Sequence, residues 1–312
     1  MSPVRPGPAP AGSRLRGILN VNKPTGITSY DVIRRVKALL RPARPALGHA
    51  GTLDPLASGI LLLLVGPATR VSRFLLESPK EYEAELLFGR RTDTDDTTGA
   101  TLAEAPVPGL DAAALTGLLG QFTGLIKQVP PCYSALKQDG VPAYRLAREG
   151  RPVQPQPRSV TVHRLELLDW QPPRARIRAC VSAGTYIRAL ARDIGAAADS
   201  AATLAALVRT RSSGFTLETA CPLAELDADT VTRRLVPVED ALPGLPRIEV
   251  SPQEAAELLA GRTVSRRRPA ASGHALARAA DGSFLALVSA DGNAIRPVRL
   301  IFVENNRPGN GH

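Results

Sequence analysis

The sequence is poor in aromatic residues and in cysteine, and both shortages narrow what the protein can be. Aromatic residues make up 4% of its 312 residues, so aliphatic side chains must fill the core. The three cysteines, Cys132, Cys180 and Cys221, lie far apart, form no CxxC pair and have no histidine at ligand spacing. We therefore expect neither a disulfide framework nor a structural zinc site, and this usage fits a reducing cytoplasm.

The sequence also lacks a long hydrophobic run. A membrane-spanning helix needs roughly 18 or more apolar residues in succession, whereas the run ILLLLVG covers only residues 60–66. This run also lies too far into the chain for a signal peptide. We therefore expect a cytoplasmic protein with no membrane partner. The hydrophobic fraction of 44% is that of an ordinary globular protein.

Positive charge, by contrast, is in excess. The chain has 39 Lys and Arg residues against 29 Asp and Glu residues, a formal net charge of +10. A basic protein without a membrane segment most often binds a polyanion, usually nucleic acid. Five of the basic residues are lysines, and Ala and Pro are abundant, so the composition of a GC-rich genome would produce the same excess of arginine. The charge favours a nucleic-acid partner without establishing one.

The chain divides into four parts by composition. Residues 1–16 are rich in Pro, Gly and Ala and carry arginines without acids, which predicts a disordered basic tail. Prolines and a glycine in the stretch at 237–250 indicate a link between a larger domain at 17–243 and a smaller one at 244–304. Residues 305–312 are expected to form a polar tail.

The hydrophobic periodicity predicts helices and strands in irregular alternation, which favours an α+β architecture over a regular βαβ winding. The run at 60–66 is a buried strand or the start of a helix, because periodicity does not decide between them. A helix after the turn at 23–26 can be capped by Thr28 or Ser29. Further helices are expected at 111–122, 185–198, 202–211 and 251–261, and strands at 81–89, 160–170, 174–184, 274–280, 283–291 and 294–303.

A single carboxylate, Asp54, stands in the loop GTLDPLASG, just before the most hydrophobic run of the chain. Gly51 and Gly59 permit tight turns around it, and Pro55 favours an extended backbone at Asp54. An acid held beside apolar residues is partly desolvated, which makes it a stronger nucleophile or base. The alternative is an aspartate that merely caps a helix or closes a loop.

Six blocks of sequence, taken in order, resemble one family. They are NKPTGITSYDVI, GHAGTLDPLASGILLLLVGPATR, KEYEAELLFGRRTDTDDTTG, QVPPCYSALKQDGVPAYRLAREG, GTYIRALARDIG and LVRTRSSGF. Over residues 17–240 the chain closely resembles the bacterial TruB family, the tRNA pseudouridine-55 synthases. Its last part resembles the PUA-type RNA-binding module that such enzymes often carry.

The resemblance implies the pseudouridine-synthase fold, which is α+β. Its catalytic domain, matched to residues 17–243, is a large mixed, mainly antiparallel sheet with flanking helices and a central cleft. Residues 244–304 are then a small PUA-like β-barrel, in agreement with the short strands and Asp-Gly turns predicted there.

The resemblance also implies an isomerase that converts uridine-55 in the T loop of tRNA to pseudouridine. Such an enzyme extrudes the uridine from its RNA stack, breaks the N1–C1′ bond, turns the base and rejoins it through C5. It needs no cofactor and no metal ion, and a monomer that binds the T arm of tRNA is expected. The catalytic Asp of the family matches Asp54, which attacks C1′, adds to C6 or removes a proton from C2′. The sequence does not choose among these roles.

Five further site residues follow from the same resemblance. Tyr82 matches a tyrosine that stacks on the flipped base and assists proton transfer at C5. Arg188 matches an arginine that pairs with the catalytic Asp and would keep it ionised. Tyr186 matches a substrate-contacting position, Leu207 an apolar wall of the uracil pocket, and His49 a histidine that fills the space left by the flipped bases. Without the family blocks, Tyr82 and Leu207 would be ordinary core residues and Arg188 a surface residue of a helix.

Basic residues outside the pocket are candidates for RNA contacts. Lys23, in the NKPTG block, matches a position that supports the active-site loop, and it is a candidate RNA contact as well. Arg266, Arg267 and Arg268 form a basic patch in the C-terminal module and are expected to bind RNA phosphates. A solvated loop is the alternative for this patch.

Two other functions fit parts of the sequence. The segment DTDDT at 93–97 fits the DxDxT motif of HAD-type phosphatases, in which the first Asp attacks phosphorus and magnesium is bound. That motif directly follows an apolar strand, whereas GRR intervenes here, so an Asx-rich turn is the simpler interpretation. The basic surface would also suit a protein that binds and folds tRNA without catalysis.

Overall fold

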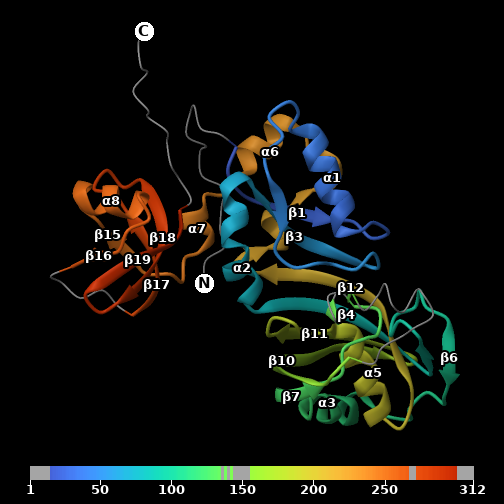
Figure 1. Cartoon of the computed structure of the whole chain (residues 1–312). Helices are drawn as coiled ribbons and strands as arrows, with labels where there is room; N and C mark the ends of the chain where they lie inside the picture. The colour runs from blue at the N-terminus through green and yellow to red at the C-terminus, as the bar shows by residue number, and fades with distance from the viewer. Residues whose placement is uncertain (1–14, 135–136, 139–140, 143–154, 267–271, 301–312) are drawn as a thin grey trace.

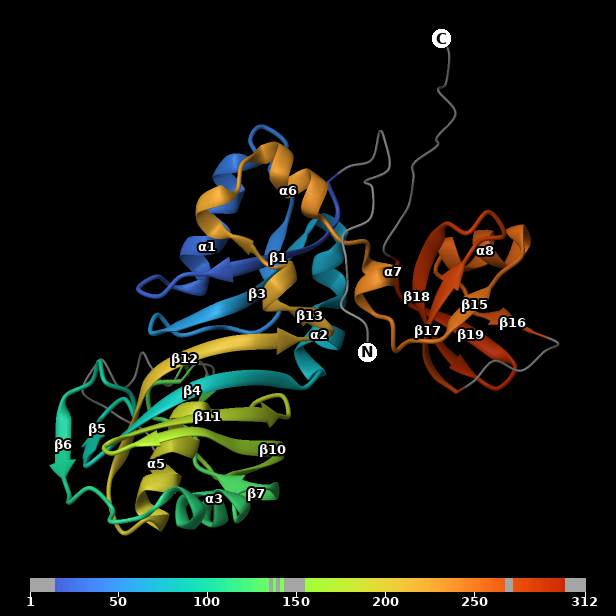
Figure 2. The same ribbon diagram turned by 180° about the vertical axis from the view of Figure 1, so that it is seen from behind.

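The computed structural model describes residues 15–134, 137–138, 141–142, 155–266 and 272–300 (Figure 1). The chain forms a ten-stranded mixed sheet and a separate five-stranded sheet. Helices α1 and α6 lie at one end of the larger sheet, and α3 and α5 lie at the other (Figure 2). The helices are α1 (Ser29–Leu39), α2 (Ser72–Glu77), α3 (Ala112–Gly120), α5 (Ile187–Ala197), α6 (Ala228–Arg234), α7 (Val238–Ala241) and α8 (Pro252–Leu259).

The large sheet has the strand order β14-β1-β3-β12-β4-β11-β10-β7, with β2 paired to β3 and β13 to β12. The pairs β1–β14 and β3–β12 are parallel, and the other neighbours are antiparallel. The predicted mixed, mainly antiparallel sheet is thus confirmed. Its strands are β1 (Gly17–Lys23), β2 (Leu47–His49), β3 (Ala57–Val65), β4 (Lys80–Phe88), β7 (Gly124–Gln128), β10 (Arg158–Gln171), β11 (Arg174–Val181), β12 (Ala202–Ser212), β13 (Phe215–Thr216) and β14 (Cys221–Pro222).

The apolar run before Gly66 is a strand, β3, that is buried on both faces. Leu61 and Leu63 belong to one hydrophobic cluster, whereas Leu62 and Leu64 belong to another. Successive side chains of a strand point to opposite faces, so a strand with a core on each side must be apolar at every position. This is why hydrophobic periodicity alone did not separate strand from helix here.

Helix α1 begins as the sequence predicts. Thr28 is its N-cap and forms a capping box with Asp31, because each side chain bonds the backbone N–H of the other residue. Val32 and Val36 on its apolar face enter the core with Leu19 of β1. The predicted helices at 111–122, 185–198 and 251–261 correspond to α3, α5 and α8, and α3 and α5 pack against each other and against the sheet.

The predicted helix at 202–211 was wrong, because these residues form strand β12. Ala and Leu favour a helix weakly, but such propensities are overridden when a segment fills the centre of a sheet. Strand β12 lies between β3 and β4, and Leu207 is in register with Ala57 of β3 and Ala84 of β4. Leu207 therefore projects from a strand and not from a helix.

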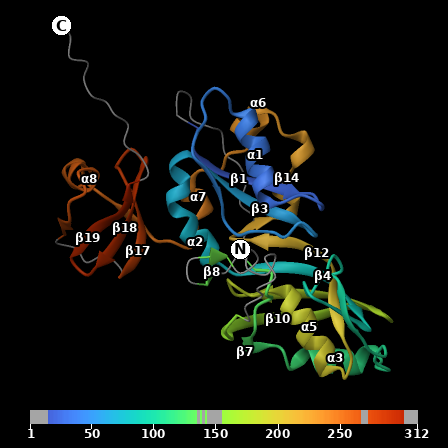
Figure 3. The ribbon, with the colours of Figure 1, turned by 45° about the vertical axis from the view of Figure 1, so that its right-hand side comes forward.

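The C-terminal part is a curled five-stranded sheet of order β15-β17-β18-β19-β16, with α8 packed on it. Glycines with positive φ, Gly282 and Gly292, form the turns on either side of β18, as predicted. A cluster that includes Val238 and Leu242 also contains Leu276 and Leu287, so this sheet shares a core with the segment before it. In Figure 3 the segment that carries α7 runs between the large sheet and this C-terminal sheet. The strands are β15 (Arg247–Glu249), β16 (Val264–Ser265), β17 (Gly273–Arg278), β18 (Phe284–Asp291) and β19 (Ala294–Leu300).

Two short strand pairs complete the description. Strands β5 (Arg90–Thr92) and β6 (Thr101–Glu104) pair with each other, as do β8 (Lys137–Gln138) and β9 (Val141–Pro142). In the described part of the chain, no helix combines the length and apolar character that crossing a bilayer requires. The domain boundary at 243–244 stays a prediction. The predicted tail at 305–312 and all but two residues of the tail at 1–16 lie outside the described residues.

Candidate active site

A cavity of about 260 Å³ opens where the loop before β3 meets strands β4 and β12 and the start of helix α5. Five of the predicted site residues line it: Asp54, Tyr82, Tyr186, Arg188 and Leu207. They come from four segments that are far apart in the sequence, so the fold alone brings them together. A concave site with apolar walls and a few convergent polar groups is the usual form of a ligand-binding pocket.

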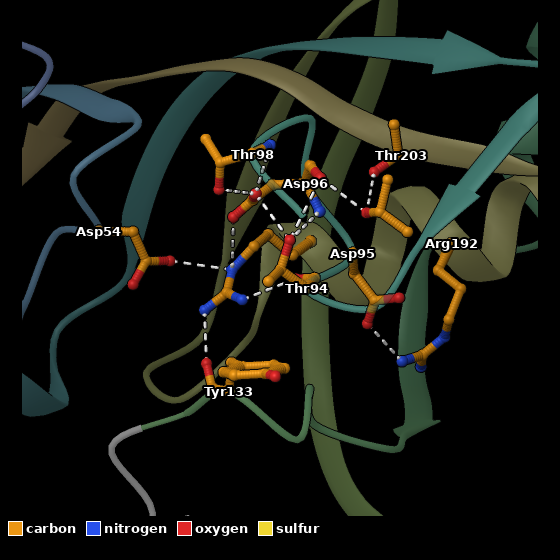
Figure 4. Close-up of polar contacts among 10 residues, drawn as sticks. Asp54, Thr94, Asp95, Asp96, Thr98, Tyr133, Arg192 and Thr203 are labelled. Atoms are coloured by element: carbon orange, nitrogen blue, oxygen red, sulfur yellow. Dashed lines mark hydrogen bonds and ion pairs between the residues drawn. The ribbon is translucent and has the colours of Figure 1, made fainter. Parts of the chain in front are cut away.

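Asp54 is paired with Arg188 at this cavity. The distance from Arg188 Nε to Asp54 Oδ2 is 2.9 Å, and the exposed fraction is 6% for the arginine side chain and 42% for the aspartate side chain. Arg188 Nη1 donates to the carbonyl of Thr94 at 2.8 Å, and Nη2 donates to the carbonyl of Tyr133 at 2.9 Å. In Figure 4, dashed lines join Asp54, Thr94 and Tyr133 to one guanidinium. The guanidinium is therefore fixed by the protein, and it holds a carboxylate that remains open to the cavity.

The contact between Arg188 and Asp54 is an ion pair and not a well-aligned hydrogen bond. The Nε atom of Arg188 is buried and makes no hydrogen bond of standard geometry, although it lies 2.9 Å from the carboxylate. A second carboxylate, Asp96, lies 3.9 Å from the same nitrogen. Charge attraction, which depends weakly on angle, accounts for this geometry better than hydrogen bonding does.

The segment DTDDTTG builds the support for Arg188. The carboxylate of Asp96 accepts hydrogen bonds from the hydroxyl groups of Thr94 and Thr98, which closes the loop on itself. This loop presents the Thr94 carbonyl that receives Arg188. Figure 4 shows Asp96 between Thr94 and Thr98. The structure thus agrees with an Asx-rich turn.

The geometry does not favour the phosphatase alternative for this segment. The carboxylate of Asp93 accepts from the backbone N–H of Ala100, and that of Asp95 pairs with Arg192 at 2.8 Å. The acids are thus held by the protein itself. Within the described ranges, no three His, Cys, Asp or Glu side chains are grouped so as to hold a metal ion.

Two side chains from neighbouring strands form walls of the cavity. Tyr82 on β4 and Leu207 on β12 both line it, and both are otherwise buried. Strands β4 and β12 are antiparallel neighbours, with Tyr82 in register with Arg209 and Leu207 in register with Ala84. An aromatic ring and a branched aliphatic side chain suit the two faces of a flat ligand such as a nucleobase.

Tyr186, immediately before α5, is held by a buried amide. Its backbone N–H donates to Gln128 Oε1 at 2.8 Å, and Gln128 Nε2 donates back to its carbonyl at 3.1 Å. The guanidinium carbon of Arg158 lies 4.8 Å from the centroid of the Tyr186 ring, a cation–π contact. The backbone that carries Arg188 two residues later is thereby anchored.

Arg209 is a site residue that the sequence analysis missed. It is fully buried, yet its Nε donates to the carbonyl of Ile60 at 2.7 Å and its Nη2 to that of Gly51 at 3.0 Å. It joins β12 to both ends of the segment that carries Asp54, and it lines the cavity. The signal was an arginine inside the block LVRTRSSGF, two residues after Leu207.

Lys80 was missed as well. Its ammonium is buried at the edge of the cavity and donates to the carbonyls of Leu75 at 3.2 Å, Ser78 at 2.5 Å and Leu76. Burial, followed by the positive charge of Arg209, lowers the pKa of Lys80 to about 8. It stands two residues before Tyr82, at the first position of the block KEYEAEL.

The structure buries Lys23 and places it near Asp54, not on an outer surface. Its Nζ donates to the carbonyls of Pro24 at 2.9 Å and Ile27 at 2.8 Å. Burial lowers the pKa of Lys23 to about 8, and the nearby carboxylate of Asp54 opposes that shift. A supporting position below the active-site loop fits these contacts better than a direct RNA contact.

His49 lies outside the set of described residues that line the cavity. It is on β2, opposite Leu63 of β3, and its Nδ1 is buried with no hydrogen-bond partner among the described residues. Burial, together with the charge of Arg209, lowers the pKa of His49. The role predicted for His49, to fill the space left by the flipped bases, stays a prediction.

The C-terminal basic patch is only partly described. Arg266 pairs with Glu254 at 3.0 Å and donates to the carbonyl of Glu249 at 2.8 Å, so its guanidinium is already engaged. Arg267 and Arg268 lie outside the described residues. The proposed phosphate contacts of this patch stay a prediction.

Comparison with known proteins gives consistent matches at the levels of family, sequence and fold. Residues 37–187 match the family described as TruB family pseudouridylate synthase (N terminal domain), and residues 245–301 match tRNA Pseudouridine synthase II, C terminal. Proteins named tRNA pseudouridine synthase B are 40% identical over 294 residues in Azoarcus sp. and 44% identical over 256 residues in Gloeobacter violaceus. The first match covers 93% of this chain and 96% of the relative, and the second covers 80% and 87%.

Solved structures share the fold. A chain of a Cbf5-Nop10-Gar1 complex superposes with a TM-score of 0.71 at 25% identity, covering 97% of this chain and 91% of that chain. A chain from an H/ACA RNP bound to a substrate RNA containing 2′-deoxyuridine gives a TM-score of 0.70 at 24% identity, covering 93% and 86%. The fold class predicted from the sequence is confirmed by these likenesses.

Proposed function

The chain belongs to the TruB family of pseudouridylate synthases, which are isomerases, and we propose that it converts uridine-55 in the T loop of tRNA to pseudouridine with Asp54 as the catalytic residue. The names of its relatives in Azoarcus sp. and Gloeobacter violaceus support tRNA as the substrate. Monomeric action in the cytoplasm on the T arm is part of the same proposal.

The observation that carries the proposal is the position of Asp54. Its carboxylate is open to a cavity of about 260 Å³. The Nε atom of the buried Arg188 forms an ion pair with Asp54 Oδ2 at 2.9 Å. An enzyme that acts on a base within folded RNA must extrude that base, at a cost of a few kcal/mol. A pocket with a preset carboxylate offsets part of that cost and needs no rearrangement when the nucleotide arrives.

The reaction conserves every atom of the substrate. The bond between N1 of uracil and C1′ of the ribose breaks, the base turns, and a bond between C5 and C1′ forms. The proton that leaves C5 is balanced by the proton that N1 gains. Asp54 acts on the sugar or the base in the first half of this sequence, and its carboxylate is the acidic group of the cavity that Arg188 holds in place.

The remaining side chains have roles that follow from their places in the cavity. Tyr82 stacks on the base, and its hydroxyl is available for the proton transfer at C5. Leu207 forms an apolar wall that confines the ring while it turns. Tyr186 bounds the cavity on the α5 side, where Gln128 fixes its backbone.

Asp54→Asn tests the proposal, because it keeps the size of the side chain and removes its charge. We expect the variant to bind an unmodified tRNA transcript and to form no pseudouridine, as measured by single-turnover tritium release from C5 and by position-specific mapping of pseudouridine. Glu104→Gln on β6, an exposed carboxylate, is the matched control and should keep full activity.

Two results would contradict the proposal. Full activity of Asp54→Asn would remove Asp54 from the mechanism, and pseudouridine at another position alone would reject uridine-55 as the target. A protein that binds and folds tRNA without catalysis would show the same tRNA binding in both variants and no pseudouridine with the wild type.

A further inference from the structure

We propose that the outer surface of helix α1 and the loop after it binds the phosphate backbone and an unstacked base of the RNA substrate, next to the nucleotide that enters the cavity. This α1 surface borders a hollow of about 680 Å³, separate from the cavity at Asp54. It comprises Tyr30, Arg34, Lys37, Arg41 and Arg44. The inference rests on the proposed function, because that function brings RNA to this side of the molecule.

The α1 surface is strongly basic. Residues 30–47 contain five basic residues and a single acid, Asp31. Asp31 pairs with Arg34, but Lys37, Arg41 and Arg44 are exposed and have no ion pair with any described residue. Unpaired cations that line a hollow attract a polyanion, and phosphate groups are the anions that RNA presents at regular spacing.

Exposed arginines on the strands β10 and β11 are neutralised by acidic partners. On strands β10 and β11, Arg164 lies 2.9 Å from Glu81 and Arg176 lies 3.6 Å from Glu83, and Arg174 is paired with Glu85. The α1 surface differs from that face of the sheet, because Lys37, Arg41 and Arg44 lie together around one hollow and have no acidic partner within the described residues.

Tyr30 adds a feature that charge alone would not require. It is 69% exposed and is the one exposed aromatic side chain in the described part of the chain. Exposing an aromatic ring to water without a partner is unfavourable, whereas a base that has left its stack can cover such a ring. Basic side chains combined with a stacking ring are typical of surfaces that bind single-stranded or looped RNA.

Helix α1 is tied directly to the catalytic loop. The hydroxyl of Ser29 donates to the carbonyl of Leu53 at 3.0 Å and accepts from the N–H of Leu53 at 2.9 Å. Tyr30 directly follows Ser29, and Asp54 directly follows Leu53. The two hydrogen bonds between Ser29 and Leu53 therefore connect the backbone next to Tyr30 with the backbone next to Asp54. The proposed path of the RNA therefore runs from the cavity over the α1 surface.

Arg44 has a backbone conformation that supports a role for its side chain. Its φ is +40°, a left-handed value that Gly or Asn adopts more readily than Arg does. Its N–H donates to the carbonyl of Leu40 at 3.1 Å, which ends the helical segment. A glycine would close this turn with less strain, so the arginine contributes something other than the turn itself.

The test is the salt dependence of tRNA binding. The triple variant Lys37→Ala, Arg41→Ala, Arg44→Ala removes exposed side chains only, and its melting curve is expected to match the wild type. With an unmodified tRNA transcript we expect a tenfold or greater rise in Kd at 100 mM salt, since each phosphate contact contributes about 0.9 to the slope of log K against log salt. The slope itself should fall by about two to three.

A charge-matched control separates a specific surface from a general effect of net charge. The variant Arg164→Ala, Arg174→Ala, Arg176→Ala loses the same three charges from β10 and β11, and it should bind nearly as the wild type does. Tyr30→Ala should weaken binding without changing the salt slope, while Tyr30→Phe should bind normally because stacking needs only the ring.

The outcome for the α1 surface is independent of the outcome for catalysis. An unchanged Kd and salt slope in the α1 triple variant would overturn the inference even when Asp54→Asn is inactive as expected. Equal losses in the two triple variants would also overturn it, because net charge would then explain the effect. An active Asp54→Asn variant would overturn the proposed function, whereas a selective loss in the α1 triple variant would still establish an RNA-binding surface.

Discussion

Arg188 Nε lies 2.9 Å from Asp54 Oδ2, and the two side chains differ sharply in their surroundings. The arginine is buried and bonded to the carbonyls of Thr94 and Tyr133, while the aspartate is open to the cavity. The arginine therefore sets the position of the ion pair, because its guanidinium is held by two backbone carbonyls. The Asp54 carboxylate therefore lies beside a fixed positive charge before any ligand enters the cavity.

Arg188→Lys should slow catalysis while tRNA binding is retained. A lysine keeps the positive charge but cannot reach two carbonyls and Asp54 at once, because it lacks the planar fork of donors. We expect the single-turnover rate of pseudouridine formation to fall about 100-fold, in line with the loss of one preset polar interaction. Arg174→Lys, an exposed arginine on β11, is the control and should be unaffected.

Tyr82→Phe separates the two roles proposed for this residue. The phenylalanine ring still stacks on the base and fills the same wall of the cavity, so tRNA binding should not change. Loss of a proton-transfer group typically costs about 10²–10⁴-fold in rate, and we expect a fall of that order in the single-turnover rate. A rate equal to that of the wild type would leave Tyr82 as a stacking wall without a part in proton transfer.

Gly59→Ala should destabilise the protein and displace the active-site loop. Gly59 has φ of +94°, and a Cβ atom there would overlap the backbone of Arg209. We expect the free energy of unfolding to fall by about 3 kcal/mol or more, because strain and overlap add. Gly117→Ala is the control, since this exposed glycine in α3 has open space around it and the change should stabilise by about 1 kcal/mol. Urea unfolding measures both, and equal values for the two variants would refute the argument.

Because Lys80 is buried with a lowered pKa, we expect the free energy of unfolding to rise with pH above neutrality. Its pKa is about 8 in the folded protein, and an unfolded lysine has a pKa of about 10.4. Between these values the unfolded state binds more protons, so the free energy of unfolding increases as pH rises through this range. Below pH 8 the cost of burying the charge is present in full.

Lys80→Met should remove this contribution. Between pH 8 and pH 10 the wild type should gain about 2 kcal/mol from Lys80 that the variant does not gain. Urea unfolding at the two pH values gives the difference, with Arg73→Met on α2 as an exposed control that alters charge without removing a lysine. Parallel pH profiles of wild type and Lys80→Met would contradict the prediction.

The sequence predicted what is local or carried by a long motif. The cap at Thr28, the strand that carries Tyr82 and the helix that carries Arg188 all follow from patterns within about ten residues. The resemblance placed Asp54 and Arg188 in one site, and the fold brings them to 2.9 Å. A specific block such as GTLDPLASG therefore located an acid that composition alone would have left as a loop residue.

What the sequence missed depends on contacts between distant segments. Strand β12 is a strand because β3 and β4 flank it, and its own Ala and Leu residues favour a helix. Arg209 and Lys80 are buried cations whose partners are backbone carbonyls, and backbone carbonyls leave no trace in a sequence. The tertiary structure was needed to show that these two charges, together with Lys23, lie inside the protein and not on its surface.

The hydrophobic cluster that joins Leu276 and Leu287 to Ile60 and Leu62 of β3 has a geometric consequence. Strand β3 begins three residues after Asp54, so a single hydrophobic cluster links the C-terminal sheet to the strand that follows the Asp54 loop. A substitution in this cluster is therefore expected to disturb both the C-terminal sheet and the loop that carries Asp54.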